Sequence, residues 1–210
     1  MSDSDDEITL SIESMNALKE FLKEREETVQ KEQETKEIQE DWQLSQFWYA
    51  EETSEHVAKV LETEAGESSI VVCLSTPSIY KVLDKYKETS KINSFLFEYD
   101  KRFSCYGDRF CFYDYNQPLN VPKELVEKVD YICLDPPFLS EECLEKVTET
   151  IKLLRKGPET KLLLMTGRIQ WPHIQRLLPD MKICKFEPKH PRLQNDFFAC
   201  CNYDSKLLFE

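Results

Sequence analysis

One short stretch, Asp135-Pro136-Pro137-Phe138, places a carboxylate, two prolines and an aromatic ring directly after an apolar run. The run "VDYICL", residues 129–134, is rich in β-favouring residues and predicts a buried strand. Neither proline has a backbone N–H, so the strand must end there. Asp135 and the carbonyl of Pro136 can accept hydrogen bonds from an amine, which would aim its lone pair. Phe138 offers a face to a planar base or an alkyl-ammonium, so the stretch could bind an amine; the alternative is a turn that only ends the strand.

Two further strands are predicted to end in acids. The run "NSFLFEY", residues 93–99, contains Glu98 and is followed by Asp100, and "RFCFYD", residues 109–114, ends in Asp114. In an open parallel sheet, ligands bind beyond the carboxyl ends of the strands. A single loop acid is usually a helix cap or merely solvated, but three consecutive strands that end in carboxylates predict a binding site along that edge.

Strands and helices are predicted to alternate along the chain. Strand candidates are residues 69–74, 93–99, 109–114, 129–134 and 161–166, and helix candidates are 76–87, 122–128, 140–155 and 169–178. This alternation predicts a mostly parallel sheet with helices on both faces. Two last strand candidates, 182–188 and 196–204, have no helix between them and predict an antiparallel hairpin. The predicted fold class is therefore α/β, with a seven-stranded mostly parallel sheet that ends in a C-terminal antiparallel hairpin.

Residues 1–40 are predicted to form an acidic arm, partly disordered or helical, that precedes a domain spanning 41–210. Apolar residues at spacings of three and four would give one face of a helix in the arm; they are Ile12, Met15, Leu18, Phe21 and Leu22. The pattern fits either a solvated helix with a frayed end or an arm that docks a partner.

Composition excludes several classes of protein. The net charge is −13, and residues 1–41 hold 14 acidic and 5 basic residues. A strongly basic surface for duplex nucleic acid is therefore not expected, and a basic partner is more natural. Eight cysteines form no C-x-x-C pair, so we expect free thiols, no metal and a cytoplasmic location. The apolar runs are far shorter than the roughly 20 residues of a membrane span, and the N-terminus lacks a signal peptide. We expect a monomer.

The pattern of strand ends resembles the class I methyltransferases that use S-adenosylmethionine, and residues 135–138 resemble their amino-methyltransferase motif, [DNS]-PP-[FYW]. The resemblance implies that catalysis on a nitrogen depends on Asp135, Pro136 and Phe138. It implies cofactor contacts from Phe47, Tyr49, Ser75, Thr76, Glu98, Asp100 and Asp114. An acid after the second strand would hold the ribose hydroxyls, and one after the third would hold the adenine amino group.

Two segments of that resemblance carry alternatives. The usual glycine-rich loop after the first strand is replaced by residues 75–78, "STPS", so either small residues substitute for glycine or the cofactor site is lost. The aromatic segment "SQFWYAEET", residues 45–53, precedes the first strand, where similar enzymes line the cofactor. The alternative for this segment is a hydrophobic plug between the arm and the domain.

Several longer strings narrow the resemblance to one family, among them "DWQLSQFWY", "FLFEYDKRF" and "LDPPFLSEECL". They resemble the cytosolic lysine methyltransferases of translation elongation factor 1-alpha, a family earlier labelled as N6-adenine DNA methyltransferases. The resemblance covers residues 40–205 and implies that this elongation factor, a basic protein, is the partner. It also implies S-adenosyl-L-methionine as the methyl donor.

The acceptor nitrogen is not fixed by the motif, because lysine and adenine both present a primary amine. Net charge favours a protein over a nucleic acid, and the missing glycine loop leaves a non-catalytic scaffold as a third hypothesis. A lysine must lose its proton to react, and its ordinary pKa is about 10.4. A carboxylate beside the lysine favours its ammonium form. We therefore expect Asp135 to align the amine rather than to act as a strong base. Candidate walls of the substrate pocket are Tyr113, Tyr115 and Phe138, with His190 at the rim.

Overall fold

The computed structural model describes residues 15, 19–21, 23, 38–44, 46–193 and 196–210. Two compact units are present, residues 1–38 and residues 39–210. In the first unit residues 15, 19–21 and 23 are helical, and Met15 and Phe21 are exposed. The other apolar positions of the predicted arm, Ile12, Leu18 and Leu22, lie outside the described residues, and the predicted boundary at residue 40 stays a prediction.

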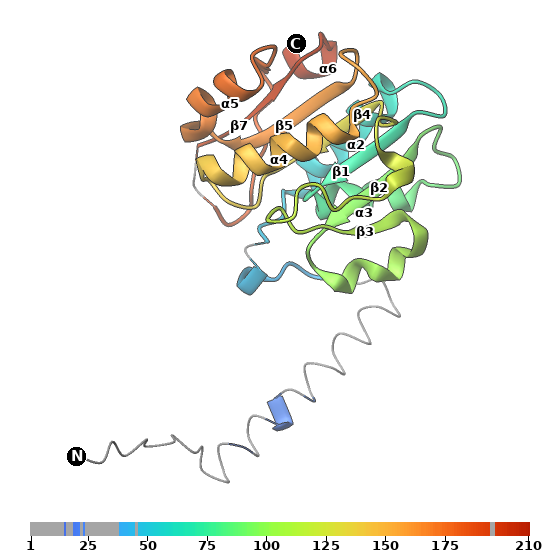
Figure 1. The fold of residues 1–210 in the computed structure, drawn as a ribbon, viewed down its shortest axis with the longest axis vertical. Coiled ribbons are helices and arrows are strands. Elements are labelled where there is room, and N and C mark those ends of the chain that lie inside the picture. Colours follow the sequence, from blue (N-terminus) through green and yellow to red (C-terminus); the bar gives the residue numbers. More distant parts are fainter. Residues whose placement is uncertain (1–14, 16–18, 22, 24–37, 45, 194–195) are drawn as a thin grey trace, which may run out of the picture. The chain divides into compact units, whose positions relative to one another are not determined.

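The second unit is built on a seven-stranded sheet with the order β3-β2-β1-β4-β5-β7-β6 (Figure 1). The strands are β1 (Ile70–Leu74), β2 (Asn93–Glu98), β3 (Phe110–Phe112), β4 (Tyr131–Leu134), β5 (Lys161–Gly167), β6 (Lys182–Ile183) and β7 (Phe197–Cys201). All pairings among the first five strands are parallel, and β7 is antiparallel to both of its neighbours. The predicted α/β fold with an antiparallel C-terminal hairpin is confirmed.

Helices cover both faces of this sheet, as predicted (Figure 1). The α-helices are α2 (Glu51–Glu64), α3 (Pro77–Lys85), α4 (Glu141–Leu154), α5 (Trp171–Leu177) and α6 (Lys206–Phe209). Short 3-10 helices lie at η1 (Trp42–Leu44), η2 (Lys101–Arg109), η3 (Lys123–Leu125) and η4 (Arg168–Gln170). Ser140 caps α4 by accepting a hydrogen bond from the Cys143 N–H, and Pro77 stands in the first turn of α3.

Two predicted elements depart most from the structure, and the predicted strand at 109–114 is also too long, since β3 spans only Phe110–Phe112. The predicted helix at 122–128 is only the 3-10 turn η3, and the chain leaves it through Glu127 at a φ of 56°. The predicted strand at 182–188 ends after Ile183. Beyond it, the N–H groups of Lys185 and Phe186 donate to the carbonyl of Leu208 in α6 rather than to β7. Periodicity does not reveal such local competition for backbone partners.

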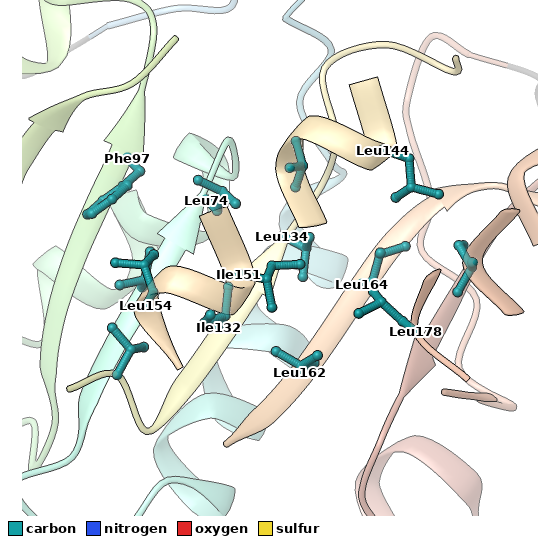
Figure 2. Packing of buried hydrophobic residues seen from close by; sticks show 14 of the residues in the cluster. Leu74, Phe97, Ile132, Leu134, Leu144, Ile151, Leu154, Leu162, Leu164 and Leu178 are labelled. Atoms are coloured by element: carbon teal, nitrogen blue, oxygen red, sulfur yellow. The ribbon is translucent and has the colours of Figure 1, made fainter. Parts of the chain in front are cut away.

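The core places β4 rigidly in the middle of the sheet. All four residues of β4 are fully buried, and Figure 2 shows Ile132 and Leu134 facing Ile151 and Leu154 of α4. Burying one such side chain stabilises the fold by about 1.5–3 kcal/mol. The residue that follows this strand, Asp135, is therefore held by a well-packed element.

Two further observations bear on the environment of the protein. All eight cysteines are free thiols, as expected. Among the described residues, no helix is both long and apolar enough to cross a membrane.

Candidate functional site

A cavity of about 640 Å³ opens at the carboxyl edge of the sheet. Its walls come from the segment before α2, from the ends of β1 to β4, and from the chain between β6 and β7. It brings together every predicted site residue except Asp100, namely Phe47, Tyr49, Ser75, Thr76, Glu98, Tyr113, Asp114, Tyr115, Asp135, Pro136, Phe138 and His190. The volume lies within the range of small-molecule and cofactor sites.

Glu98, the last residue of β2, presents one carboxylate oxygen to the cavity. Its Oε1 accepts from the N–H of Tyr99 at 3.0 Å, from the N–H of Asp100 at 3.2 Å and from Gln46 Nε2 at 3.4 Å. Its Oε2 has no donor among the described residues. Burial raises the pKa of this carboxyl to about 7, although the three hydrogen bonds oppose the rise. The free oxygen can accept hydroxyl protons from a ligand.

Asp100 is the predicted site residue that the cavity does not include. Its carboxylate accepts from Arg102 Nη2 at 2.7 Å and Nε at 2.9 Å, and from Gln46 Nε2 at 3.1 Å. Of the two acids proposed for ribose, the geometry favours Glu98. Gln46 was not predicted, yet its buried amide bridges both acids. The only signal in the sequence was its place inside the aromatic segment.

The turn after β1 adopts a conformation typical of glycine without containing glycine. Ser75 has a φ of 54°, in the left-handed region, and its N–H donates to the carbonyl of Phe97 at 2.8 Å. Such a conformation costs a non-glycine residue about 1–2 kcal/mol. Next to it, the buried Thr76 hydroxyl has no hydrogen-bond partner in the described part of the chain. The loop therefore keeps a close backbone approach to the cavity and leaves one hydroxyl for a ligand.

Asp135 lies where β4 meets the cavity, and it also keeps one oxygen free. Its Oδ2 accepts a hydrogen bond of 2.6 Å from the Tyr49 hydroxyl, and its Oδ1 has no donor among the described residues. The side chain keeps some exposure to the cavity, but protein surrounds it closely, and burial raises its pKa to about 7. The hydrogen bond from Tyr49 opposes this rise and the charge of Glu98 adds to it.

An aromatic pair stands beside Asp135. Phe138 is 46% exposed, and its ring centroid lies 5.6 Å from that of Tyr115 at an interplanar angle of 56°. The hydroxyl of Tyr113 is hydrogen-bonded to Thr150 Oγ1 of α4 at 2.8 Å, so this residue offers only its ring to the cavity. Phe138 and Tyr115 thus form the wall that an acceptor would meet.

The remaining predicted residues lie on either side of this wall. Asp114 Oδ1 accepts from the N–H of Asn116 at 2.9 Å, and Phe47 is 37% exposed at the mouth of the cavity. The His190 ring packs against the Tyr49 ring, with centroids 4.2 Å apart and planes tilted by 32°. Its Nδ1 lies 3.2 Å from the carbonyl of Trp48, and its buried Nε2 has no partner within the described ranges.

The charge of the cavity lining is one-sided. Glu98, Asp114 and Asp135 line it, and none of the described lining residues is a lysine or an arginine. The described residues also contain no His/Cys/Asp/Glu group arranged to hold a metal ion. The arrangement suits a polar, partly cationic ligand and an amine acceptor, and it offers no cation to a phosphate.

Comparison with known proteins agrees with this chemistry. Residues 40–205 match the family model described as "Probable N6-adenine methyltransferase". A protein-lysine N-methyltransferase of Dictyostelium discoideum is 65% identical over 99% of this chain and 97% of its own length. The EEF1A lysine methyltransferase 1 of Homo sapiens is 43% identical over 99% of this chain and 98% of its own.

A solved structure supports the fold alone. The branched-chain polyamine synthase of Thermus thermophilus aligns with a TM-score of 0.60 and 13% identity, covering 88% of this chain and 67% of its own. The matched family model and the full-length relatives define the group. The chain belongs to the methyltransferase family whose curated members are protein-lysine N-methyltransferases.

Proposed function

We propose that this enzyme transfers a methyl group from S-adenosyl-L-methionine to a lysine of translation elongation factor 1-alpha. The observation that carries the proposal is the end of β4, where Asp135 turns one free carboxylate oxygen to the cavity beside the exposed ring of Phe138. Relatives from mouse, human and chicken, at 43–44% identity, are named for this elongation factor. The enzyme is proposed to act as a monomer in the cytoplasm.

The lining fits the proposed donor. Glu98 Oε2 is free to accept from ribose hydroxyls, and Asp114 lies at the end of the next strand, where an adenine amino group would reach it. The unpartnered Thr76 hydroxyl and the left-handed turn at Ser75 suit the amino-acid end of the same molecule. When bound, S-adenosylmethionine supplies a methyl group on a positively charged sulfur.

The acceptor side fits an alkyl-amine. Asp135 Oδ1 can accept one N–H of the amine and so orient the nitrogen lone pair, while Phe138 and Tyr115 shield its methylene chain from water. Shielding lowers the pKa of the lysine, because desolvation disfavours the ammonium form. The carboxylate of Asp135 opposes that effect, so its main role is alignment.

One finding favours the adenine alternative, namely the description of the family model. Phe138 could also stack on a base. Against this, the described lining offers three acids and no cation, so a phosphate group would be repelled. In a scaffold that binds no cofactor, Glu98 Oε2 and Asp135 Oδ1 would stay without hydrogen-bond donors from any ligand.

The test combines the purified enzyme, methyl-labelled S-adenosylmethionine and purified elongation factor 1-alpha, with total RNA and DNA as parallel acceptors. We expect label on the protein that protease removes and nuclease does not. Label on nucleic acid would support the alternative hypothesis, methylation of adenine in DNA or RNA. Absence of cofactor binding by calorimetry would establish the scaffold.

A further inference from the structure

Among the described lining residues, Tyr49 makes the shortest hydrogen bond in the cavity, although its predicted role was contact with the cofactor. Its hydroxyl lies 2.6 Å from Asp135 Oδ2, across 86 residues of chain. We propose that Tyr49 is a positioning residue that holds Asp135 by one carboxylate oxygen and so presents the other oxygen to the acceptor amine. This inference rests on the proposed methyl transfer and names a residue that governs it.

The hydrogen bond has a defined direction. Burial and the neighbouring Asp135 raise the pKa of Tyr49 well above its ordinary value, so the phenol keeps its proton and donates. The side-chain torsion of an aspartate that turns its carboxylate plane is broad and roughly two-fold. Without a fixed donor the carboxylate would rotate. With Oδ2 engaged, Oδ1 is held in one direction.

Tyr49 is itself fixed by chain from the far end of the sequence. Its ring packs at a tilt against His190, and the centroid of the His190 ring lies 4.3 Å from that of Phe197. Because the Trp48 carbonyl can only accept, His190 Nδ1 carries the hydrogen of that bond. The Ala50 N–H also donates to the Lys189 carbonyl at 2.8 Å.

A second bond strengthens the same junction. The Lys189 N–H donates to Thr53 Oγ1 at 3.0 Å, so the first turn of α2 is tied to the chain between β6 and β7. The phenol is mounted on two segments joined by three hydrogen bonds, which is the support that a positioning group requires.

The Tyr49 hydroxyl also lowers the pKa of Asp135, against the larger effect of burial. The titratable groups that face this carboxylate are Tyr49, Glu98 at the end of β2, Cys133 on its own strand and Cys143 on α4. Of these, the Tyr49 hydroxyl stabilises the ionised form, whereas the charge of Glu98 raises the pKa. The ionised carboxylate is the stronger acceptor, and a protonated Oδ1 would donate to the amine instead of accepting from it, so we expect activity to fall as pH falls through the pKa of Asp135. Loss of the phenol moves that fall to higher pH.

The experiment compares the full chain with Tyr49→Phe, using elongation factor 1-alpha as acceptor between about pH 5.5 and pH 9. We expect kcat at pH 7 to fall about tenfold or more, with part of the loss recovered at pH 9. The acidic limb of the pH profile should move up by about one unit. Cofactor affinity should stay within about twofold.

The matched control is Tyr203→Phe. It removes another buried phenol hydrogen bond, the one between Tyr203 and Tyr131, far from the cavity lining. This change should lower thermal stability without moving the pH profile. An equal profile shift in the control would overturn the inference, because the effect would then be general loosening of the fold.

A second measurement does not depend on turnover. The carboxyl of Asp135 can be titrated by NMR with ¹³C-labelled aspartate, assigned through Asp135→Asn, in the wild type and in Tyr49→Phe. A higher pKa in the variant supports the inference, and an unchanged pKa overturns it. If Tyr49→Phe binds the cofactor more weakly but leaves the acidic side of the pH profile unchanged, Tyr49 only contacts the cofactor and the inference is wrong. A wild-type enzyme that binds cofactor but leaves the elongation factor unlabelled would instead defeat the proposed function.

Discussion

Strand β4 lies between two aspartates whose surroundings differ sharply. Asp130, just before the strand, accepts from the Ile70 N–H at 2.9 Å and from Lys156 Nζ at 2.9 Å. Asp135, just after it, accepts only from the Tyr49 hydroxyl within the described chain. The first carboxylate is matched by a cation and a backbone donor. The second is left short of donors in a buried position, which marks it for a ligand.

The same contrast holds for the two edges of the sheet. A cavity of about 170 Å³ lies at the amino edge, and two of its acids are paired with cations: Lys161 Nζ lies 3.2 Å from Glu64 Oε2, and Lys156 Nζ lies 2.9 Å from Asp130 Oδ1. The described lining of the larger cavity, at the carboxyl edge, holds three acids and no lysine or arginine. Whether a buried acid has a cation beside it is therefore a better guide to a structural or a ligand-binding role than its residue type.

Replacing the two aspartates in parallel gives the largest expected effect. In Asp135→Ala the amine loses its carboxylate acceptor and keeps only the carbonyl of Pro136, and we expect kcat to fall about 10²- to 10³-fold. Cofactor affinity should change little. The fold should persist, because a carboxyl whose pKa is raised by burial does not stabilise the native state at pH 8. Single-turnover kinetics with elongation factor 1-alpha and calorimetry with S-adenosylmethionine check both parts.

Asp130→Ala is predicted to behave in the opposite way. Loss of the acceptor for the Ile70 N–H should cost about 1 kcal/mol of unfolding free energy. The ion pair adds little, since the Lys156 side chain is 56% exposed. Turnover should match the wild type in the folded fraction. A variant at Asp130 that stays stable but loses turnover would break the contrast between the two edges.

Glu98→Gln should separate cofactor affinity from stability. Loss of a charged acceptor for hydroxyl groups should weaken binding of S-adenosylmethionine by about tenfold or more. The same change should stabilise the unliganded protein at pH 8, since it removes a carboxylate that burial disfavours. Calorimetry and urea denaturation measure the two effects, with the exposed Glu51 changed to Gln as control.

The pH dependence of that stability gain follows from the sign of the shift. Burial raises the folded pKa of Glu98 from its ordinary 4.5 to about 7, so its native state binds a proton more tightly than the unfolded chain. This contribution to stability is fully present below the ordinary pKa and is lost as pH rises through about 7. The difference in unfolding free energy between Glu98→Gln and wild type should therefore grow from pH 4.5 to pH 8. An equal difference at both pH values would show that Glu98 titrates normally.

Strand ends and turn chemistry were readable from the sequence because they depend on local residue types. The apolar runs, the prolines after Asp135 and the acids after β2 and β3 placed the edge of the sheet correctly. Contacts between distant segments were not readable. The bond from Tyr49 to Asp135 spans 86 residues. The pairing of Asp100 with Arg102, only two residues further along the chain, was not predicted either. Local patterns do not encode which of two nearby acids finds a cation.

The sequence could not show whether the loop without glycine after β1 still binds a cofactor. Two serines, one at each end of β1, allow a test. Ser68 and Ser75 flank β1 with φ values of 65° and 54°. Changing either to glycine relieves left-handed strain and should stabilise the fold by about 0.5–1 kcal/mol, after the added flexibility of the unfolded chain.

Only Ser75 lines the large cavity, so only Ser75→Gly should alter cofactor affinity, by about threefold or less, whereas Ser68→Gly leaves it unchanged. A small effect would mean that the backbone of this turn, held open by a serine in a conformation typical of glycine, does the binding. A loss of tenfold or more in Ser75→Gly alone would show that the serine hydroxyl holds the cofactor directly. In that case the loop is a different solution from the glycine-rich one and not a strained copy of it.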